Sequence, residues 1–424
     1  MPEGPGNGNR ITDGRELVDP VSYAENGTPH DLWTRLRQES PVHRCTPAGF
    51  EPFWAITKHA DISAISKQPA LFSNEPGVVV LGDHQLKARA DGNGLGAMKT
   101  IIEMDPPDHV AYRKVTSAWF TPRSITRLDA AIEESARRIF DDLAGTGGEG
   151  VCDWATEVAV RHPLTILSTV LGLTPEEEPK VLELTNQLFA ADDPDLRREG
   201  DDYDERVVAL GTEIYALFER IIEDRRAHPT DDLATVIANA EIDGQQMGPL
   251  ETFGYYLIIF TAGHDTTKNA IAGMMQELLK NPEELAKLRA HPEWIDSAVE
   301  EIVRWTAPVN YMKRTALADT EVRGQKIAKG DFLAMFYASA NRDEEVFADP
   351  FAFRVDRNPN PHLGFGIGEH FCLGAHMAKR SLRALVAEMA NRLESVQATG
   401  EASQIHSSFV VGLKKLPVSY RITP

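Results

Sequence analysis

The decapeptide Phe365-Gly-Ile-Gly-Glu-His-Phe-Cys-Leu-Gly374 decides how the rest of the chain is interpreted. Its three glycines lie close to one cysteine, so the backbone must approach a flat, bulky group or turn where a Cβ would clash. A helical pattern begins at Gly374, and a thiolate at Cys372 would receive its N–H donors and the positive end of its dipole. We therefore expect an ionised sulfur, which suits a nucleophile or a metal ligand. No second cysteine is near, which excludes a zinc knuckle and a Cys-x-x-Cys redox pair.

This decapeptide resembles the haem-binding loop of the cytochrome P-450 family at every defining position of the pattern Phe-Gly-x-Gly-x-His-x-Cys-x-Gly. The resemblance implies haem b as the cofactor and Cys372 as the axial thiolate ligand of its iron. It also implies that Phe365, His370 and Gly374 contact the cofactor. One alternative is a glycine-rich turn before a helix with an incidental buried cysteine. A hydrolase built on Cys372 and His370 is disfavoured, because residues two apart in a turn can hardly form an oriented nucleophile–base pair.

The composition narrows the class of protein. With 424 residues the chain can bury a large core and a cofactor of haem size. Its net charge of -20 argues against a general binder of nucleic acid or anionic membranes. The three cysteines, Cys45, Cys152 and Cys372, are too widely spaced for a disulfide framework, which fits a reducing cytoplasm. The first twenty residues lack the apolar core of a signal peptide, and no apolar run suggests a membrane anchor.

The pattern along the chain predicts a mainly α protein with a smaller β-rich part. We expect residues 1–18 to form a flexible N-terminal arm and residues 19–424 a single catalytic domain. Helices are predicted at 31–37, at 59–66, through most of 108–280, and from Thr174, a typical N-cap. Strands are predicted around 42–44, 53–57, 320–322 and 332–335. The weakly patterned segment 72–107 is interpreted as a lid. The family resemblance implies a triangular prism of helices around a buried haem.

Residues 250–280 form the most apolar helical run, yet its middle reads Thr261-Ala-Gly-His-Asp-Thr-Thr267. A glycine inside a helix costs about 1 kcal/mol relative to alanine. The Thr266 hydroxyl can bond the carbonyl of Ala262 and open the helix there. Gly263 would let a flat ligand or dioxygen approach the backbone. The alternative is a kinked core helix with a satisfied threonine.

The same segment resembles the family's oxygen-activating motif, Ala/Gly-Gly-x-Asp/Glu-Thr-Thr/Ser, in full. The resemblance implies two catalytic residues: Thr266 would bind dioxygen and water, and Asp265 would deliver protons for cleavage of the O–O bond. Proton delivery requires a group within hydrogen-bond reach or one water away. A peroxide-driven haem enzyme is disfavoured, because peroxide bypasses ordered proton delivery.

Glu301 and Arg304 stand one helical turn apart before Pro308, so both lie on one face. They could be an ordinary surface pair worth about 0.3 kcal/mol, and Glu300 competes as the partner of Arg304. They also resemble the family's Glu-x-x-Arg motif, with Arg357 as its third member. The resemblance implies a structural trio that holds the cysteine loop in place.

Haem propionates are anions and need basic partners. His109 and Arg113, at i and i+4, resemble the family's propionate pair, and Arg314 and His370 match further such positions. Each could instead be a solvated surface base.

Several stretches point to a branch of the family. Residues 314–324, 339–347 and 362–366 resemble the bacterial terpineol hydroxylase branch, whereas 347–351 and 358–362 are similar to the actinobacterial cholesterol-oxidising branch. The expected reaction is hydroxylation of a C–H bond in a terpenoid or alkyl-aromatic hydrocarbon. A steroid or cholesterol side chain is the alternative substrate. An alternative from another class is a non-catalytic protein that binds a hydrophobic ligand.

The substrate pocket is predicted from family position and is mostly apolar, as a hydrocarbon site should be. Its predicted residues are Ile258, Thr261, Ala262, Val309, Asn310, Tyr311, Met312, Phe409, Val410 and Val411. Asn310 and Tyr311 could bind a substrate oxygen. An apolar stripe is equally typical of any core.

Only 52 residues follow Cys372, so we expect no fused reductase domain. Electrons would come from a ferredoxin and its reductase. A basic patch that would steer an acidic carrier is predicted from Arg123, Arg127, Lys379, Arg380 and Arg383.

Overall fold

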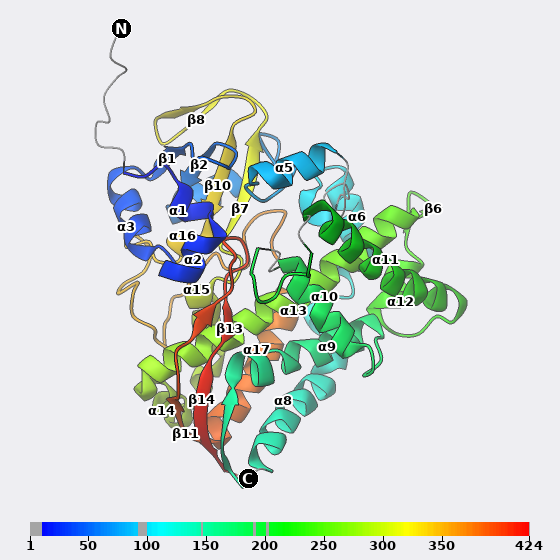
Figure 1. Cartoon of the computed structure of the whole chain (residues 1–424), viewed down its shortest axis with the longest axis vertical. Helices are drawn as coiled ribbons and strands as arrows, with labels where there is room; N and C mark the ends of the chain where they lie inside the picture. The colour runs from blue at the N-terminus through cyan, green and yellow to red at the C-terminus, as the bar shows by residue number, and fades with distance from the viewer. Residues whose placement is uncertain (1–10, 92–99, 146, 190–191, 201–202, 424) are drawn as a thin grey trace.

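The strand-rich part of the molecule joins segments that are far apart in the sequence (Figure 1). The computed structural model describes residues 11–91, 100–145, 147–189, 192–200 and 203–423. Its main sheet has the strand order β1 (Val42–Cys45), β2 (Phe53–Ile56), β10 (Phe332–Phe336), β7 (Tyr311–Ala316) and β3 (Phe72–Ser73). β10 runs parallel to β2, and the other neighbours are antiparallel. The predicted strands at 42–44, 53–57 and 332–335 are confirmed.

The remaining strands form smaller sheets. The three-stranded sheet contains β11 (Leu393–Ala398), β14 (Pro417–Ile422) and β4 (Glu149–Asp153). Three ladders pair β5 (Glu241–Ile242) with β6 (Gln245–Gln246), β8 (Thr320–Val322) with β9 (Gln325–Ile327), and β12 (Ser403–Gln404) with β13 (Leu413–Lys415). β8 and β9 are joined by Arg323 and Gly324, both with positive φ, as a tight hairpin requires. The predicted strand at 320–322 is thereby confirmed.

Helices make up the larger part of the chain and confirm the predicted mainly α class. Before the long central helix they are α1 (Arg15–Val18), α2 (Pro20–Asn26), α3 (His30–Glu39), α4 (His59–Ser66), α5 (Asp83–Ala90), η2 (Ile101–Glu103), α6 (Asp108–Ser117), α7 (Pro122–Ile125), η3 (Thr126–Leu128), α8 (Asp129–Ala144), the π-helix η4 (Trp154–Ala159), α9 (Arg161–Leu171), α10 (Glu178–Phe189), α11 (Tyr203–Ala227) and α12 (Leu233–Ala238). From there on they are α13 (Pro249–Lys280), α14 (Pro282–Ala290), η5 (Pro292–Trp294), α15 (Ile295–Thr306), α16 (Tyr337–Ala340) and α17 (Ala375–Arg392). Within the described residues, no helix is both long and apolar enough to cross a membrane.

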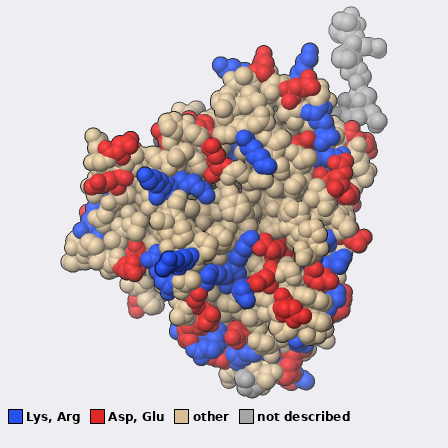
Figure 2. All heavy atoms as spheres, turned by 180° about the vertical axis from the view of Figure 1, so that it is seen from behind, with Lys and Arg blue, Asp and Glu red and all other residues tan. Residues whose placement is uncertain are grey.

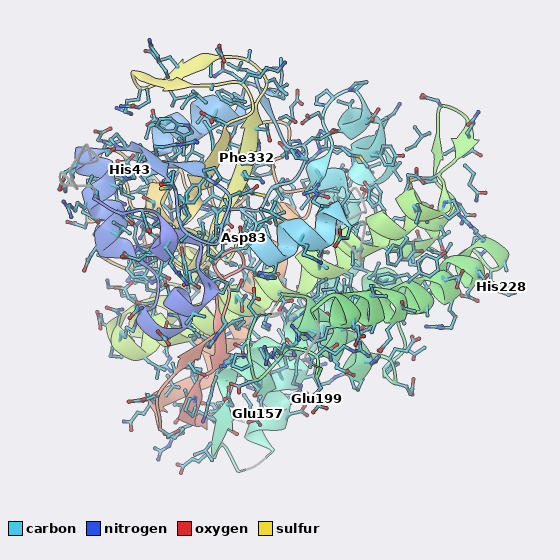
Figure 3. The ribbon with its side chains drawn as sticks, turned by 45° about the horizontal axis from the view of Figure 1, so that its top comes forward. His43, Asp83, Glu157, Glu199, His228 and Phe332 are labelled. Carbon is cyan, nitrogen blue, oxygen red and sulfur yellow. The ribbon has the colours of Figure 1, made fainter. Side chains whose placement is uncertain are left out.

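The main sheet and most of the helices lie on different sides of the molecule, whereas the three-stranded sheet of β11, β14 and β4 lies beside α8 and α14 (Figure 1). Phe332 marks the strand-rich side, and Glu157, Glu199 and His228 lie on the helical side (Figure 3). α13 runs between them and is buried along most of its length. It begins after Gly248 with a proline at its first position and ends before Pro282, as the preferences of proline require.

Some predicted boundaries were wrong. The predicted arm covered residues 1–18, of which 1–10 lie outside the described residues. α1 buries two successive apolar side chains, Leu17 and Val18, in the core. The helix predicted from Thr174 begins at Glu178, after a turn in which Glu177 accepts the Thr174 N–H. The predicted lid, 72–107, contains β3, α5 and η2, and its residues 92–99 lie outside the described range.

Candidate active site

The cysteine loop folds back on itself through two glycines with positive φ, Gly366 (+68°) and Gly368 (+81°). A Cβ at Gly368 would collide with the carbonyl oxygen of Ser66, so this position requires glycine on both counts. The Cys372 N–H donates to the carbonyl of Phe365 at 2.9 Å, which closes the loop just before α17. Cys372 therefore lines a cavity between this loop and α13.

The ionisation of Cys372 is controlled by opposing effects. Burial raises the pKa of the thiol, whereas the Gly374 N–H and the Arg113 guanidinium lower it. Burial outweighs these two effects, while the N–H at the helix end acts in the direction that the sequence predicts. A coordinated metal ion deprotonates a thiol outright and would reverse that balance.

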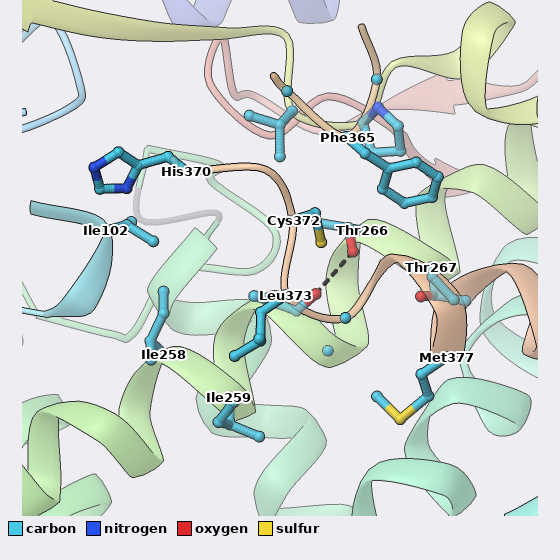
Figure 4. A pocket seen from close by; sticks show the side chains of 18 of the residues that line it. Ile102, Ile258, Ile259, Thr266, Thr267, Phe365, His370, Cys372, Leu373 and Met377 are labelled. Carbon is cyan, nitrogen blue, oxygen red and sulfur yellow. Dashed lines mark hydrogen bonds between the residues drawn. The ribbon is translucent and has the colours of Figure 1, made fainter. Parts of the chain in front are cut away.

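The cavity is enclosed by several helices and by the strand-rich part (Figure 4). Its apolar lining includes Ile101, Ile102, Phe120, Pro163, Ile166, Leu167, Ile258, Ile259, Val309, Met312, Leu373 and Met377. Its polar lining includes Asn74, His109, Arg113, Tyr255, Thr266, Thr267, Arg314, Tyr337, His370, Cys372 and Ser381. No aspartate, glutamate or lysine is among the described lining residues. The space therefore suits a large, mostly apolar ligand.

α13 presents Ala262, Gly263, Thr266 and Thr267 to the cavity. The Thr266 hydroxyl donates to the carbonyl of Ala262 at 2.8 Å, which confirms the predicted bond (Figure 4). The helix is continuous through this segment, so the predicted opening was wrong.

Asp265 does not line the cavity with Thr266. Successive residues of a helix point in different directions, and the side chain of Asp265 is buried beside Lys268, whose ammonium contacts its Oδ1. Oδ2 has no hydrogen-bond partner among the described residues. The predicted catalytic role of Asp265 therefore requires that protons pass from its side chain to the cavity through other groups or water.

Four basic side chains meet at one end of the cavity. The rings of His109 and His370 are stacked at 3.9 Å between their centroids. Burial lowers the pKa of both imidazoles, that of His370 to about 3, so both are neutral at pH 7. Nδ1 of His109 and Nε2 of His370 are buried without a partner among the described residues. Arg113 donates to the carbonyl of Phe371 at 2.6 Å, and Arg314 to that of Lys313 at 2.9 Å. The cluster thus offers two cations and two unused ring nitrogens to an anionic ligand.

The predicted trio of Glu301, Arg304 and Arg357 is present and fully enclosed. Arg304 donates to both oxygens of Glu301 at 2.6 and 2.8 Å, and Arg357 Nε lies 3.0 and 3.1 Å from them. The two arginines also donate to backbone carbonyls of residues 341–352. Glu300 turns outward and pairs with His362 and Lys379, so it does not compete. The trio fastens the segment that leads into the cysteine loop.

Comparison with known proteins agrees with this geometry. The family model for cytochrome P450 matches residues 22–421. The chain belongs to the cytochrome P450 family.

Individual relatives cover nearly the whole P450 chain. It is 39% identical to cytochrome P450-terp of Pseudomonas sp. over 96% of both chains. It is 35% identical to the methyl-branched lipid omega-hydroxylase of Mycobacterium bovis (91% of this chain, 89% of the relative). It is 33% identical to the steroid C26-monooxygenase of Rhodococcus jostii (97% and 86%). A solved P450 structure from Novosphingobium aromaticivorans superposes with a TM-score of 0.88 at 36% identity, covering 97% and 98% of the two chains. The protein is therefore a P450 monooxygenase of mainly α architecture with haem b as its cofactor.

The residues of this P450 fit haem b. One thiol, two arginines and two neutral histidines with unused nitrogens face one cavity, as an iron ion with two propionates requires. A Cβ built at Gly374 would have no protein atom within 4 Å, so packing within the protein does not require a glycine at this position. All eight residues predicted to contact the cofactor line the cavity: His109, Arg113, Gly263, Arg314, Phe365, His370, Cys372 and Gly374.

The predicted substrate pocket was partly wrong. Ile258, Ala262, Val309 and Met312 line the cavity, whereas Thr261, Asn310, Tyr311, Phe409, Val410 and Val411 do not. Asn310 is buried and donates to the hydroxyl of Tyr23 and the carbonyl of Ser408, both at 2.8 Å. The hydroxyl of Tyr311 accepts the Val80 N–H at 3.3 Å. The amide nitrogen of Asn310 and the hydroxyl of Tyr311 are thus bonded within the protein, and neither side chain reaches the cavity.

The other misplaced residues have similar reasons. Thr261 is buried and bonds the carbonyl of Ile258 at 3.3 Å. The ring of Phe409 packs edge-on against Tyr311 and lines a second, separate cavity. Val410 pairs with Val309 in a β-bridge, and its side chain is buried.

The sequence analysis did not predict the cavity-lining residues of α9 and η2. Pro163, Ile166 and Leu167 have the i, i+3, i+4 spacing of one helix face and all line the cavity. That spacing was visible in the sequence, but it is the same in any buried helix. Ile101 and Ile102 lie in the segment interpreted as a lid, where no periodicity pointed to them.

Proposed function

We propose that this P450 hydroxylates a C–H bond of a terpenoid or alkyl-aromatic hydrocarbon. The observation that carries the proposal is the lining of the cavity, which is apolar apart from the groups assigned to haem and a few hydroxyl and amide groups. Asn74 is bonded to the carbonyl of Ile102 at 2.7 Å, and Tyr255 to that of Tyr112 at 3.0 Å. With no acid or lysine in the described lining, a substrate held by shape and apolar contact fits best. The similarity to cytochrome P450-terp agrees with a terpenoid.

Residue roles follow from the placement of the side chains. Haem bound by the Cys372 thiolate would supply the activation of dioxygen, with Arg113, Arg314, His109 and His370 holding its propionates. The Thr266 hydroxyl can accept a hydrogen bond from water while it donates to Ala262, and so can keep a water molecule in an otherwise apolar wall. Asp265, which does not line the cavity, would deliver protons to it by way of water.

A panel of ligands tests the substrate class. Terpenoids, alkylbenzenes and sterols are added to the purified enzyme, and the change in iron spin state is recorded as each displaces water. We expect saturating changes with terpenoids or alkylbenzenes, followed by hydroxylated product when electrons are supplied. Strong binding of sterols alone would refute the proposal.

A steroid side chain is the second candidate, because the steroid C26-monooxygenase is 33% identical over most of both chains. The same panel separates it from the first. The remaining alternative, a non-catalytic binder of hydrophobic ligands, is wrong, since the chain belongs to a family of monooxygenases.

A ferredoxin with its reductase is proposed as the electron donor. The predicted basic patch is largely neutralised within the protein: Arg127 pairs with Asp231, Lys379 with Glu300, Arg380 with Asp129, and Arg383 with Asp296. Arg123 is exposed. Figure 2 shows acidic and basic side chains intermixed across one face of the molecule. Steering by charge is therefore weaker than the five basic residues alone would suggest.

The patch is tested by charge reversal. In the variants Arg123→Glu and Arg380→Glu we expect the KM for ferredoxin to rise about threefold to tenfold, more at low than at high salt. Arg137→Glu on the far part of α8 serves as the control. Unchanged ferredoxin kinetics in both variants would contradict the assignment.

Two further properties are inferred. Residues 19–424 are proposed to form one catalytic domain, supported by the pairing of β4 with β14 and of β2 with β10. A cytoplasmic location is proposed from the three cysteines, none of which is in a disulfide bond.

A further inference from the structure

The acid next to Thr266 is held by a lysine of its own helix. Asp265 and Lys268 stand three residues apart on α13, which places them one turn apart on one face. Both side chains are buried, and the ammonium group contacts Oδ1 of Asp265. Among the described residues no other acid forms an ion pair with Lys268. The charge of this lysine is therefore committed to Asp265.

The second oxygen of Asp265 is different. Oδ2 is buried and has no hydrogen-bond partner in the described part of the chain. His264 also lies near, with Nδ1 3.8 Å from Oδ1, but burial lowers the pKa of this imidazole to about 4 and leaves it neutral at pH 7. A buried carboxylate with one paired and one unpaired oxygen is costly to retain for stability alone. Such an arrangement is useful where one carboxylate oxygen must stay available to exchange protons.

We propose that Lys268 is a positioning residue for proton delivery: it fixes Oδ1 of Asp265 and thereby keeps Oδ2 as the acceptor that exchanges protons with water. The inference rests on the proposed role of Asp265. A proton taken up by Oδ2 from one water leaves to a second water near Thr266, so the carboxylate is unchanged after each transfer. Lys268 takes no part in the transfer itself and does not line the cavity.

The test compares three variants at Lys268 with a matched control. Lys268→Met removes the charge and keeps most of the volume, Lys268→Gln keeps an N–H donor, and Lys268→Arg keeps the charge. The control is Lys414→Met, because Lys414 also pairs with a fully buried carboxylate, that of Asp193 at 3.0 Å, but on β13. The carboxylate stretch of Asp265 is identified by infrared difference spectroscopy from its disappearance in Asp265→Asn. This readout needs no turnover.

In Lys268→Met we expect a shifted Asp265 band. We also expect the amount of product formed per oxygen consumed to fall about tenfold, with the remaining oxygen released as hydrogen peroxide. The solvent isotope effect on turnover should change as well. Lys268→Arg should restore all three, and Lys414→Met should alter none. If Lys268→Met does not fold, Lys268→Gln carries the same expectations.

The outcomes distinguish a failure of the role of Lys268 from a failure of the role of Asp265. An unshifted band in the neutral variants, or a shifted band with unchanged product yield, overturns the role of Lys268. If Asp265→Asn itself leaves product yield and solvent isotope effect unchanged, Asp265 does not deliver protons and the proposed function of that residue fails instead.

Discussion

Replacing Glu301 by glutamine would show how strongly the buried cluster of α15 holds the cysteine loop in place. The carboxylate has no exposed surface and accepts bonds from Arg304, Arg357, the Arg354 N–H and Asn360 at 2.6–3.1 Å. Glutamine keeps the volume but leaves two buried guanidinium groups without a counter-ion. Breaking a buried ion pair from one side costs about 3–5 kcal/mol. That is a large share of the roughly 5–15 kcal/mol by which native proteins are stable.

The neighbouring acid supplies the control. Glu300 is one residue away but about a third exposed, and it pairs with His362 at 2.9 Å and Lys379 at 2.6 Å. Glu300→Gln should therefore cost about 1 kcal/mol or less. The assay is the urea midpoint of the holoenzyme, followed both by helix content and by haem absorbance. We expect a large drop and early loss of haem in Glu301→Gln only. Equal midpoints for the two variants would refute the reasoning.

Three further changes test other parts of the structure. Gly368→Ala should destabilise the loop by about 2 kcal/mol or more, because it combines a positive φ with a collision against Ser66, and haem loss on heating measures it. Cys372→Ser should leave the helix content intact but abolish the red-shifted carbon monoxide band of the reduced protein, and a retained band would contradict the ligand assignment. Burial lowers the pKa of His162 to about 4, so from pH 6.5 down to pH 4 the unfolded chain binds a proton that the native chain does not. Stability should be full above pH 6.5 and fall by about 3 kcal/mol toward pH 4, and His162→Gln should flatten that slope in pH-dependent denaturation.

The sequence predicted best where chemistry depends on residues close together in the chain. The cysteine loop is a single short stretch of the chain. Glu301 and Arg304 are one helical turn apart, so their spacing alone placed these two side chains next to each other. Spacing did not decide between Glu300 and Glu301 as the partner of Arg304. Which acid faces inward depends on the packing of α15, and only the structure shows it.

The pocket was predicted less well because family position locates a segment but not the direction of its side chains. Strand β7 begins at Tyr311, and because successive side chains of a strand face opposite ways, Tyr311 and Met312 cannot both face the cavity. Val309 and Met312 line the cavity, whereas Asn310 and Tyr311 are turned into the protein and bonded there. A run of four consecutive residues in an extended segment could not all have faced one ligand.

The same reasoning applies to the acid–alcohol pair on α13. Successive residues of an α-helix point about 100° apart, so Asp265 and Thr266 point in different directions. Thr266 lines the cavity, whereas Asp265 is buried beside Lys268. A proton that passes through Asp265 must then enter from the flank of α13 rather than through the space that holds the substrate. In the proposed function, this separation keeps the charged side chain of Asp265 out of the mostly apolar space that would hold the substrate.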